Sequence, residues 1–184
     1  MSKKIFKIIL FSTFCFLFSA FYCFSDEKAE PVTVDGDKVE VMSAENKVEA
    51  LGNVVITYKG AKLTCDKVTV NTLTKDAHAV GNVRIDDKGS VILADEAEYN
   101  LDSKKGRMFN GRIISPPFYA KADFMEKISD KEVKMYKGYF TTCDRQRPHY
   151  RLKAKEMDFS LGEKLTARDI NFMVYNSSLT YLPK

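Results

Sequence analysis

The stretch Leu51-Gly52-Asn53-Val54-Val55-Ile56, followed by Leu63-Thr64-Cys65-Asp66-Lys67-Val68-Thr69-Val70, decides the fold. Its landmarks return at a fixed interval. Val80-Gly81-Asn82-Val83 repeats the glycine–asparagine pair 29 residues later, and the same interval separates Asp37, Asp66 and Asp95. Weaker copies follow at Phe109-Asn110-Gly111-Arg112, Asp123-Phe124-Met125 and Tyr136-Lys137-Gly138-Tyr139. Self-similarity of this length indicates one supersecondary unit stacked on copies of itself.

Each unit of about 29 residues is predicted to contain two strands. In residues 53–58 the set Val54, Ile56 and Tyr58 alternates with the set Asn53, Val55 and Thr57, and this period of two favours a half-buried strand. Lys59-Gly60 then supplies a turn. The alternation changes phase at Asp66-Lys67 and again at Asp95-Glu96. A phase change at a fixed place predicts a bulge or corner that keeps the apolar side inward.

The composition after the first 25 residues predicts an all-β protein. β-branched and aromatic residues dominate, and no proline lies between Pro31 and Pro116 to interrupt a sheet. Successive short strands of this kind fit a sandwich, jelly roll, open barrel or β-solenoid. No helix is predicted beyond the N-terminal segment.

The N-terminal segment, residues 1–25, has the composition of a signal peptide. Three lysines precede a phenylalanine-rich apolar run, and small residues near Ser25 suit a signal peptidase. We therefore expect an exported mature domain spanning residues 26–184. The apolar run is long for a signal peptide, so an uncleaved N-terminal membrane anchor stays open.

The charge of the predicted mature chain disfavours nucleic-acid binding. Without residues 1–25, the chain carries 26 basic and 25 acidic residues. This balance gives no field that would attract a polyanion, and no basic–aromatic stripe stands out.

No catalytic, cofactor or metal site is predicted. His149 lies near Cys143 and Asp144, but the spacing matches no standard zinc motif and a fourth ligand is missing. The aspartates of the repeat stand one per unit, whereas calcium loops crowd several oxygen ligands together, so solvated corners are expected. His78 is expected at the surface.

Two cysteines remain after the predicted cleavage. Cys65 occupies the repeat position that Ala94 fills in the next unit, and is expected to be a small buried residue. Cys143 lies in a polar loop, where an exported thiol usually has a disulfide partner.

The apolar side of the repeats is the candidate functional surface. It either fills a dry core, which would make the protein a scaffold, or lines a groove that accepts hydrocarbon, where each buried methylene contributes roughly 0.8 kcal/mol. The residues expected to face inward, and to contact lipid in the second case, are Val39, Val41, Val54, Ile56, Tyr58, Leu63, Val68, Val70, Val83, Ile85, Ile92, Ala97, Tyr99 and Met125.

The repeat consensus resembles the OstA-like family, which includes the lipopolysaccharide-transport protein LptA and the N-terminal domain of LptD. Three further segments resemble the LptD version: residues 138–144, with the sequence Gly-Tyr-Phe-Thr-Thr-Cys-Asp, residues 150–155, and the final Tyr181-Leu182-Pro183. The resemblance extends over residues 32–184.

This resemblance implies a V-shaped β-jelly roll in the periplasm, associated with the outer membrane, whose interior shields the acyl chains of lipopolysaccharide. Its implied partners are lipopolysaccharide, other jelly rolls joined through edge strands, and an outer-membrane barrel with which Cys143 would form a disulfide. The sequence ends where that barrel would begin, so a fragment, a truncated product and a stand-alone bridge protein all stay open.

The leading hypothesis is therefore a non-enzymatic lipid-transport module. The alternatives are a filled scaffold or docking piece of the same envelope assembly, and a membrane-anchored protein resembling LptC.

Overall fold

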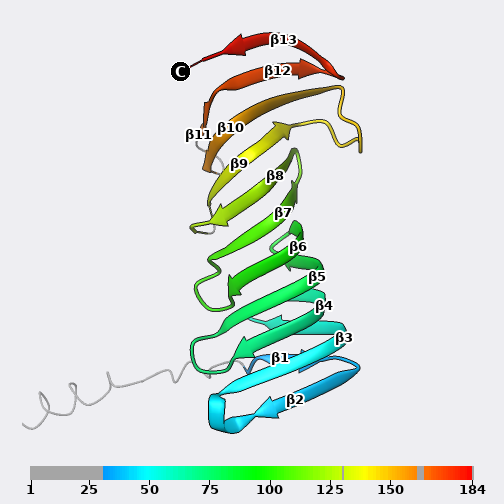
Figure 1. The fold of residues 1–184 in the computed structure, drawn as a ribbon, viewed down its shortest axis with the longest axis vertical. Coiled ribbons are helices and arrows are strands. Elements are labelled where there is room, and N and C mark those ends of the chain that lie inside the picture. Colours follow the sequence, from blue (N-terminus) through cyan, green and yellow to red (C-terminus); the bar gives the residue numbers. More distant parts are fainter. Residues whose placement is uncertain (1–30, 130, 161–163, 184) are drawn as a thin grey trace, which may run out of the picture. The chain divides into compact units, whose positions relative to one another are not determined.

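The computed structural model describes residues 31–129, 131–160 and 164–183. The predicted leader, residues 1–25, lies outside them. The described chain is almost entirely β-structure (Figure 1), with one 3-10 turn, η1 (Ser43–Glu45). Its strands are β1 (Thr33–Asp35), β2 (Lys38–Met42), β3 (Lys47–Tyr58), β4 (Ala61–Asn71), β5 (Asp76–Asp87), β6 (Ser90–Asn100), β7 (Gly106–Ser115), β8 (Phe118–Lys127), β9 (Glu132–Thr141), β10 (Tyr150–Ser160), β11 (Lys164–Arg168), β12 (Ile170–Val174) and β13 (Ser177–Leu182).

All thirteen strands belong to one antiparallel sheet in which sequence neighbours pair from β3 to β10. At one end, β1 and β2 pair with different halves of β3, so together they form a broken edge strand. At the other end, β11 and β12 pair with different halves of β10, and β13 pairs with β12. The predicted all-β jelly-roll class is confirmed.

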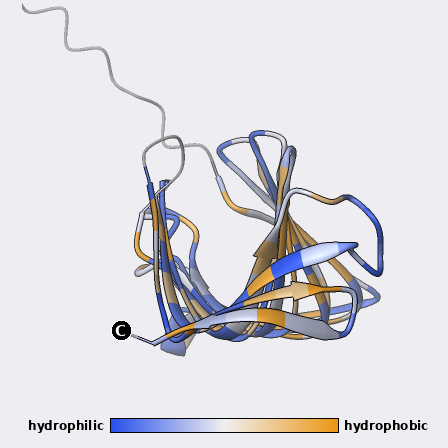
Figure 2. Ribbon diagram, turned by 90° about the horizontal axis from the view of Figure 1, so that it is seen from above, coloured by the Kyte–Doolittle hydropathy of each residue, from blue (hydrophilic) through white to orange (hydrophobic). Residues whose placement is uncertain are grey.

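The sheet is bent across its strands, so that each long strand contributes to two walls (Figure 2). The first wall contains residues 47–51, 67–71, 76–80, 96–100, 106–109, 124–127, 132–136 and 156–160. The second wall contains residues 54–58, 61–65, 83–87, 90–94, 111–115, 118–122, 138–141 and 150–154. Between β3 and β6 the register of the strand pairs shifts between these segments, as it does between Thr64 and Lys67 and between Val80 and Val83. These shifts confirm the corner that the phase change predicted.

An asparagine–aspartate hydrogen bond recurs along this corner and explains the 29-residue repeat. The side-chain amide of Asn53 donates to Asp37 Oδ2 over 3.1 Å. In the next unit Asn82 donates to Asp66 Oδ2 over 2.9 Å, and in the third Asn110 donates to Asp95 Oδ2 over 2.7 Å. The repeated aspartates are thus solvent-exposed corner residues, as expected, each bonded to an asparagine of the following strand.

The backbone at the corner requires residues that tolerate a left-handed conformation. Asn53 and Asn82 both have φ of 46°, and Asn110 has φ of 53°. Asparagine adopts this region more readily than most residues because its short polar side chain bonds locally. Gly81 precedes Asn82 with φ of +79°, and a Cβ there would lie 2.3 Å from Asp66 Oδ2. The glycine–asparagine pair therefore provides both the bend and the space for the aspartate.

The core lies on the inner face of the bent sheet. Val54, Ile56, Leu63, Val68 and Val70 are each at most 2% exposed, and they come from both walls. Alternate positions on the same strands point outward and are polar or half-exposed. The corner lets both walls turn their apolar residues toward a shared interior.

We predict that Asn82→Ala destabilises the fold by about 1–2 kcal/mol, because it removes the bond to Asp66 and places alanine in a left-handed conformation. Asn82→Gly should cost less, since glycine adopts that conformation freely. Urea unfolding of both variants, with Asp66→Ala and the double variant Asp66→Ala/Asn82→Ala, measures the coupling. Strictly additive single-variant effects would show that the bond contributes nothing.

Candidate functional site

The inner face holds all fourteen residues that the sequence predicted to face inward. Twelve of the fourteen belong to one buried cluster: Val54, Ile56, Tyr58, Leu63, Val68, Val70, Val83, Ile85, Ile92, Ala97, Tyr99 and Met125. Their inward orientation is confirmed. Whether they contact lipid stays a prediction.

Val39 and Val41 face inward as predicted, but they do not belong to the buried core. They are 40% and 66% exposed. They do pair with Ala50 and Val48, which face inward, so the two valines lie on the inner face. They are exposed because β2 is an edge strand and no further strand of the described chain covers them. The alternation predicts the face of a residue, whereas its burial depends on its place in the stack.

A row of methionines on the first wall was largely missed by the sequence analysis. Met108, Met125, Met135 and Met157 are cross-strand neighbours on β7 to β10, and each is at most 1% exposed. Only Met125 was predicted, because the others are irregularly spaced along the chain. Methionine is unbranched and flexible, so this row can adapt to differently shaped apolar partners.

The rims of the two walls are joined by polar contacts in the N-terminal half. Residues 101–105 connect β6 to β7 at the rim of the first wall. From this loop Asp102 accepts hydrogen bonds from Tyr58 over 3.1 Å and from Lys59 Nζ over 2.6 Å, both at the end of the second wall. Lys104 Nζ lies 2.9 Å from both carboxylate oxygens of Asp87, also on the second wall. We call these contacts the rim latch.

The electrostatics of the Lys59–Asp102 contact favour its charged form. The hydrogen bond from Lys59, followed by that from Tyr58, lowers the pKa of Asp102. The Asp102 contact in turn raises the pKa of Lys59. Because Asp102 is half-exposed, however, this ion pair is screened by water and contributes little to stability.

Aromatic side chains bridge the walls in the C-terminal half. Phe118 and Phe140 come from the second wall, and Phe159 comes from the first. The three ring centroids are separated by 5.7 to 5.8 Å. With the rim latch, this cluster closes the interior, so the apolar lining is packed rather than open in this structure.

The two cysteines of the described chain differ in environment. Both are free thiols: Cys65 is buried, and Cys143 is partly exposed. Burial, with a smaller effect from the Asp66 charge, raises the pKa of the Cys65 thiol to about 11. Cys143 Sγ lies 3.7 Å from His149 Nδ1. The described residues contain no group of three or more His, Cys, Asp or Glu side chains that could hold a metal ion.

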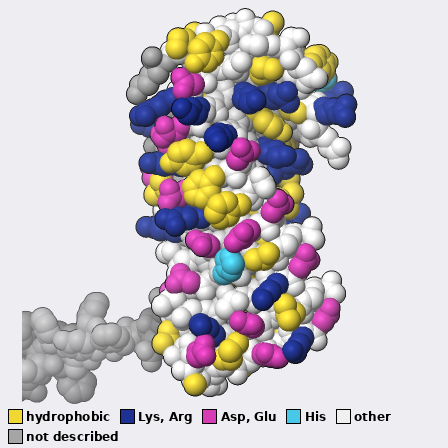
Figure 3. Space-filling model, in the orientation of Figure 1, with side chains coloured by type: hydrophobic (Ala, Val, Ile, Leu, Met, Phe, Trp, Pro, Cys, Tyr) yellow, Lys and Arg dark blue, Asp and Glu magenta, His cyan; other side chains and the backbone are white. Residues whose placement is uncertain are grey.

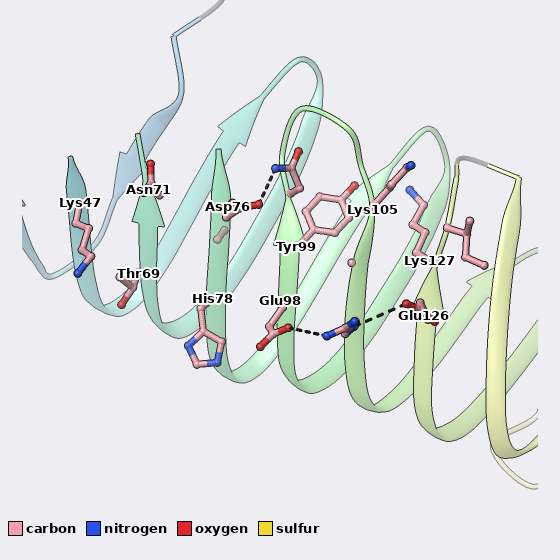
Figure 4. A pocket seen from close by; sticks show the side chains of 15 residues that line it. Lys47, Thr69, Asn71, Asp76, His78, Glu98, Tyr99, Lys105, Glu126 and Lys127 are labelled. Carbon is pink, nitrogen blue, oxygen red and sulfur yellow. Dashed lines mark hydrogen bonds and ion pairs between the residues drawn. The ribbon is translucent and has the colours of Figure 1, made fainter. Parts of the chain in front are cut away.

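The outer face of the first wall has a hollow of about 550 Å³ (Figure 4). The Arg107 side chain lies between two carboxylates. Its Nη1 is 4.0 Å from Glu98 Oε2, and its Nε is 3.7 Å from Glu126 Oε1. His78 is exposed there, as expected, and contacts Glu96 over 2.7 Å. The charges in this hollow compensate one another, which is typical of a solvated sheet face.

Comparison of the sequence with models of protein families gives a match. The family model of LptC-related lipopolysaccharide-assembly proteins matches residues 18–111. The chain belongs to this family. No curated protein matches the sequence. In the part of the chain that the structure describes, no helix is long and apolar enough to span a membrane.

A solved structure supports the fold of this LptC-related protein. The described fold of this chain is similar to the crystal structure of LptH, described as the LptA-homologous periplasmic component of the lipopolysaccharide transport device of Pseudomonas aeruginosa. The identity is 16%, the TM-score is 0.50, and the match covers 79% of this chain and 95% of LptH. The expected lipopolysaccharide-transport grouping is confirmed, while the specific likeness to the LptD N-terminal domain receives no support.

We predict that Cys65 is nearly unreactive in the folded protein at pH 8, because the neutral thiol predominates well below a pKa of about 11. In a variant with the other three cysteines replaced by serine, labelling by a maleimide should accelerate about tenfold per pH unit. Denatured protein provides the control. Fast, pH-independent labelling of folded protein would contradict the buried position.

Proposed function

We propose that this protein is a periplasmic, non-enzymatic module that shields lipopolysaccharide acyl chains on its inner face and passes them toward the outer membrane. The observation that carries this proposal is the continuous apolar lining. It runs across both walls from β3 to β10 and includes the flexible methionine row. Membership of a lipopolysaccharide-assembly family supports the choice of lipid.

Acyl chains could replace the wall-to-wall contacts if the walls separate. An exposed ion pair such as Lys59–Asp102 is screened by water and contributes little, whereas each buried methylene contributes about 0.8 kcal/mol. A chain of ten or more methylenes therefore outweighs the exposed part of the rim latch. The interior would open to admit lipid and close again when lipid leaves.

The two ends of the sheet are suited to joining further jelly rolls. At the first end, β2 presents the exposed Val39 and Val41 on the inner face. At the last end every residue of β13 is exposed, including Leu179 and Leu182. An edge strand has unpaired backbone groups, so another sheet can extend it and continue the apolar lining.

A filled scaffold is the second candidate, and the packing favours it directly. Ile56, Leu63, Ile85 and the methionines are almost completely buried without any lipid. Native mass spectrometry of gently purified protein distinguishes the two functions, since a carrier should retain an amphiphile and a filled spacer should not.

Two finer assignments depend on the ends of the chain. If residues 1–25 remain attached, the protein would be an anchored component resembling LptC, and N-terminal sequencing of exported protein decides this. If an outer-membrane barrel accompanies the domain, Cys143 would be its disulfide partner, and non-reducing electrophoresis of wild-type and Cys143→Ser envelopes would reveal the linkage.

We expect photo-crosslinkers at Ile56, Val70 and Ile92 to capture lipopolysaccharide in living cells, because these positions face the interior. Crosslinkers at Lys67 and Glu96, on the outer face, serve as controls and should capture little. Capture is measured by immunoblotting for the lipid. Equal capture at inner and outer positions would refute the lipid-binding interior.

The rim latch provides a separate prediction. Asp87→Asn with Asp102→Asn should weaken both rim contacts and increase capture at Ile56. Asp86→Asn, which loses the neighbouring contact with Arg84 on the same wall, is the matched control. Unchanged or reduced capture in the latch variant would show that the rims do not limit access.

We expect Val41→Asp to weaken association with a neighbouring jelly roll, because it places a charge on the exposed inner face of the first edge. Crosslinking yields across that edge measure the effect. Thr33→Asp, exposed on β1, is the control. Val41→Asp should leave lipid capture at Val70 intact, and unaltered association would contradict docking at this edge.

A further inference from the structure

The basic residues of the chain are concentrated in its C-terminal half. Residues 31–100 contain eight basic residues (Lys and Arg) and twelve acidic residues (Asp and Glu). Residues 101–184 contain seventeen basic and ten acidic residues. Figure 3 shows the Lys and Arg side chains gathered over the upper part of the molecule, which contains β7 to β13 in Figure 1. The small net charge of the whole chain conceals this asymmetry.

The outer face of the first wall compensates its charges from strand to strand. Its cross-strand row in this half runs through Glu98, Arg107, Glu126, Lys134 and Asp158, and the sign alternates at every step. Opposite charges on facing strands stabilise a sheet, so this row needs no ligand.

On the outer face of the second wall, in contrast, charges of the same sign face one another on neighbouring strands. Its row places Arg112 directly across from Lys121, and Tyr139 lies between Lys121 and Lys153. Arg151 also stacks over the Tyr139 ring, 5.6 Å from its centroid. Like charges on facing strands are destabilising, so this arrangement costs the free protein stability.

A hollow of about 650 Å³ lies beside this row at the corner of the sheet. Four lysines line it, Lys121, Lys137, Lys153 and Lys155, and we call it the lysine hollow. At the corner, Lys137 occupies the left-handed position that Asn53, Asn82 and Asn110 take in the earlier units, with φ of 51°. The asparagine–aspartate bond of those units is thus replaced here by a free cationic side chain.

The four lysines of the hollow have no ion pair or side-chain hydrogen bond with any described residue. Two carboxylates also line the hollow, Asp123 and Asp169, and Asp169 accepts a hydrogen bond from Tyr181 over 3.4 Å. Four cations and two anions leave an excess of positive charge. Lysine ammonium groups carry three donors each and bind phosphate as point charges.

We propose that the lysine hollow is a binding site for phosphate groups. Adjacent strands are about 4.8 Å apart, so Lys121 and Lys153 lie roughly 10 Å apart at their Cα atoms, close enough for their long side chains to hold one or two phosphates between them. Each phosphate would supply nearly two negative charges and relieve the repulsion along the row. The site lies on the outer face, so it is distinct from the proposed acyl-chain lining.

The test titrates the full chain with inorganic pyrophosphate and follows backbone amide resonances. We expect saturable shifts around the corner of β8 to β10. Lys121→Gln with Lys153→Gln should weaken binding about tenfold or more, because two charge-assisted contacts are lost. Lys62→Gln with Lys105→Gln removes the same charge elsewhere and should leave the affinity unchanged. Absence of saturation, or equal weakening by both double variants, would overturn the proposal.

A second arm identifies where the phosphate comes from. Phosphatidylcholine vesicles with and without phosphatidic acid are compared in flotation assays with the same variants. Flotation that needs phosphatidic acid and the hollow lysines, together with pyrophosphate binding, indicates lipid-borne phosphate. Pyrophosphate binding without flotation indicates a soluble phosphate ligand, and both results support the site. Vesicle binding without pyrophosphate binding would indicate a diffuse membrane surface and would refute it. Lipid capture at Ile56 is read independently, so failure here leaves the proposed function untouched.

Discussion

In the N-terminal half, the bend of the sheet is accompanied by one repeated contact, the hydrogen bond from a left-handed asparagine to an aspartate earlier in the chain. Each of the three bonds lies at the corner, and each permits a change of phase that keeps the apolar side inward. Without that change, a strand of eleven or twelve residues would turn half of its apolar side chains to water. One buried interior shared by two walls is the consequence.

The interior itself combines two properties that bear on lipid transport. It is tightly packed, and most of its lining residues are almost completely buried in the absence of ligand. Its closure, however, relies on a half-exposed ion pair, a less exposed one and a partly buried aromatic cluster. The lining is also rich in methionine, which repacks at lower cost than branched residues. The lipid-bearing open state that we propose is therefore compatible with the packed sheet of this structure.

The corner changes character toward the C-terminal half. The asparagine of the early units gives way to Lys137, and the facing position on β10 is Lys155. Together with the uncompensated row on the second wall, this change turns a structural corner into a cationic surface. The same backbone geometry thus serves stability in one half and, we infer, ligand recognition in the other.

The sequence alone determined the strand content, the two-strand unit and the position of the corner, because these depend on local alternation and on residues that tolerate unusual backbone angles. It also identified twelve of the buried residues, since their face follows from alternation. Only the tertiary structure showed that Asn82 bonds to Asp66, that Val41 is exposed at an edge, and that Met108, Met135 and Met157 join Met125 in one row. It alone joined Asp102 to Lys59 and gathered Lys121, Lys137, Lys153 and Lys155. These contacts depend on which strands become neighbours and on where the stack ends, and strand register and stacking are set by the whole sheet rather than by any single segment.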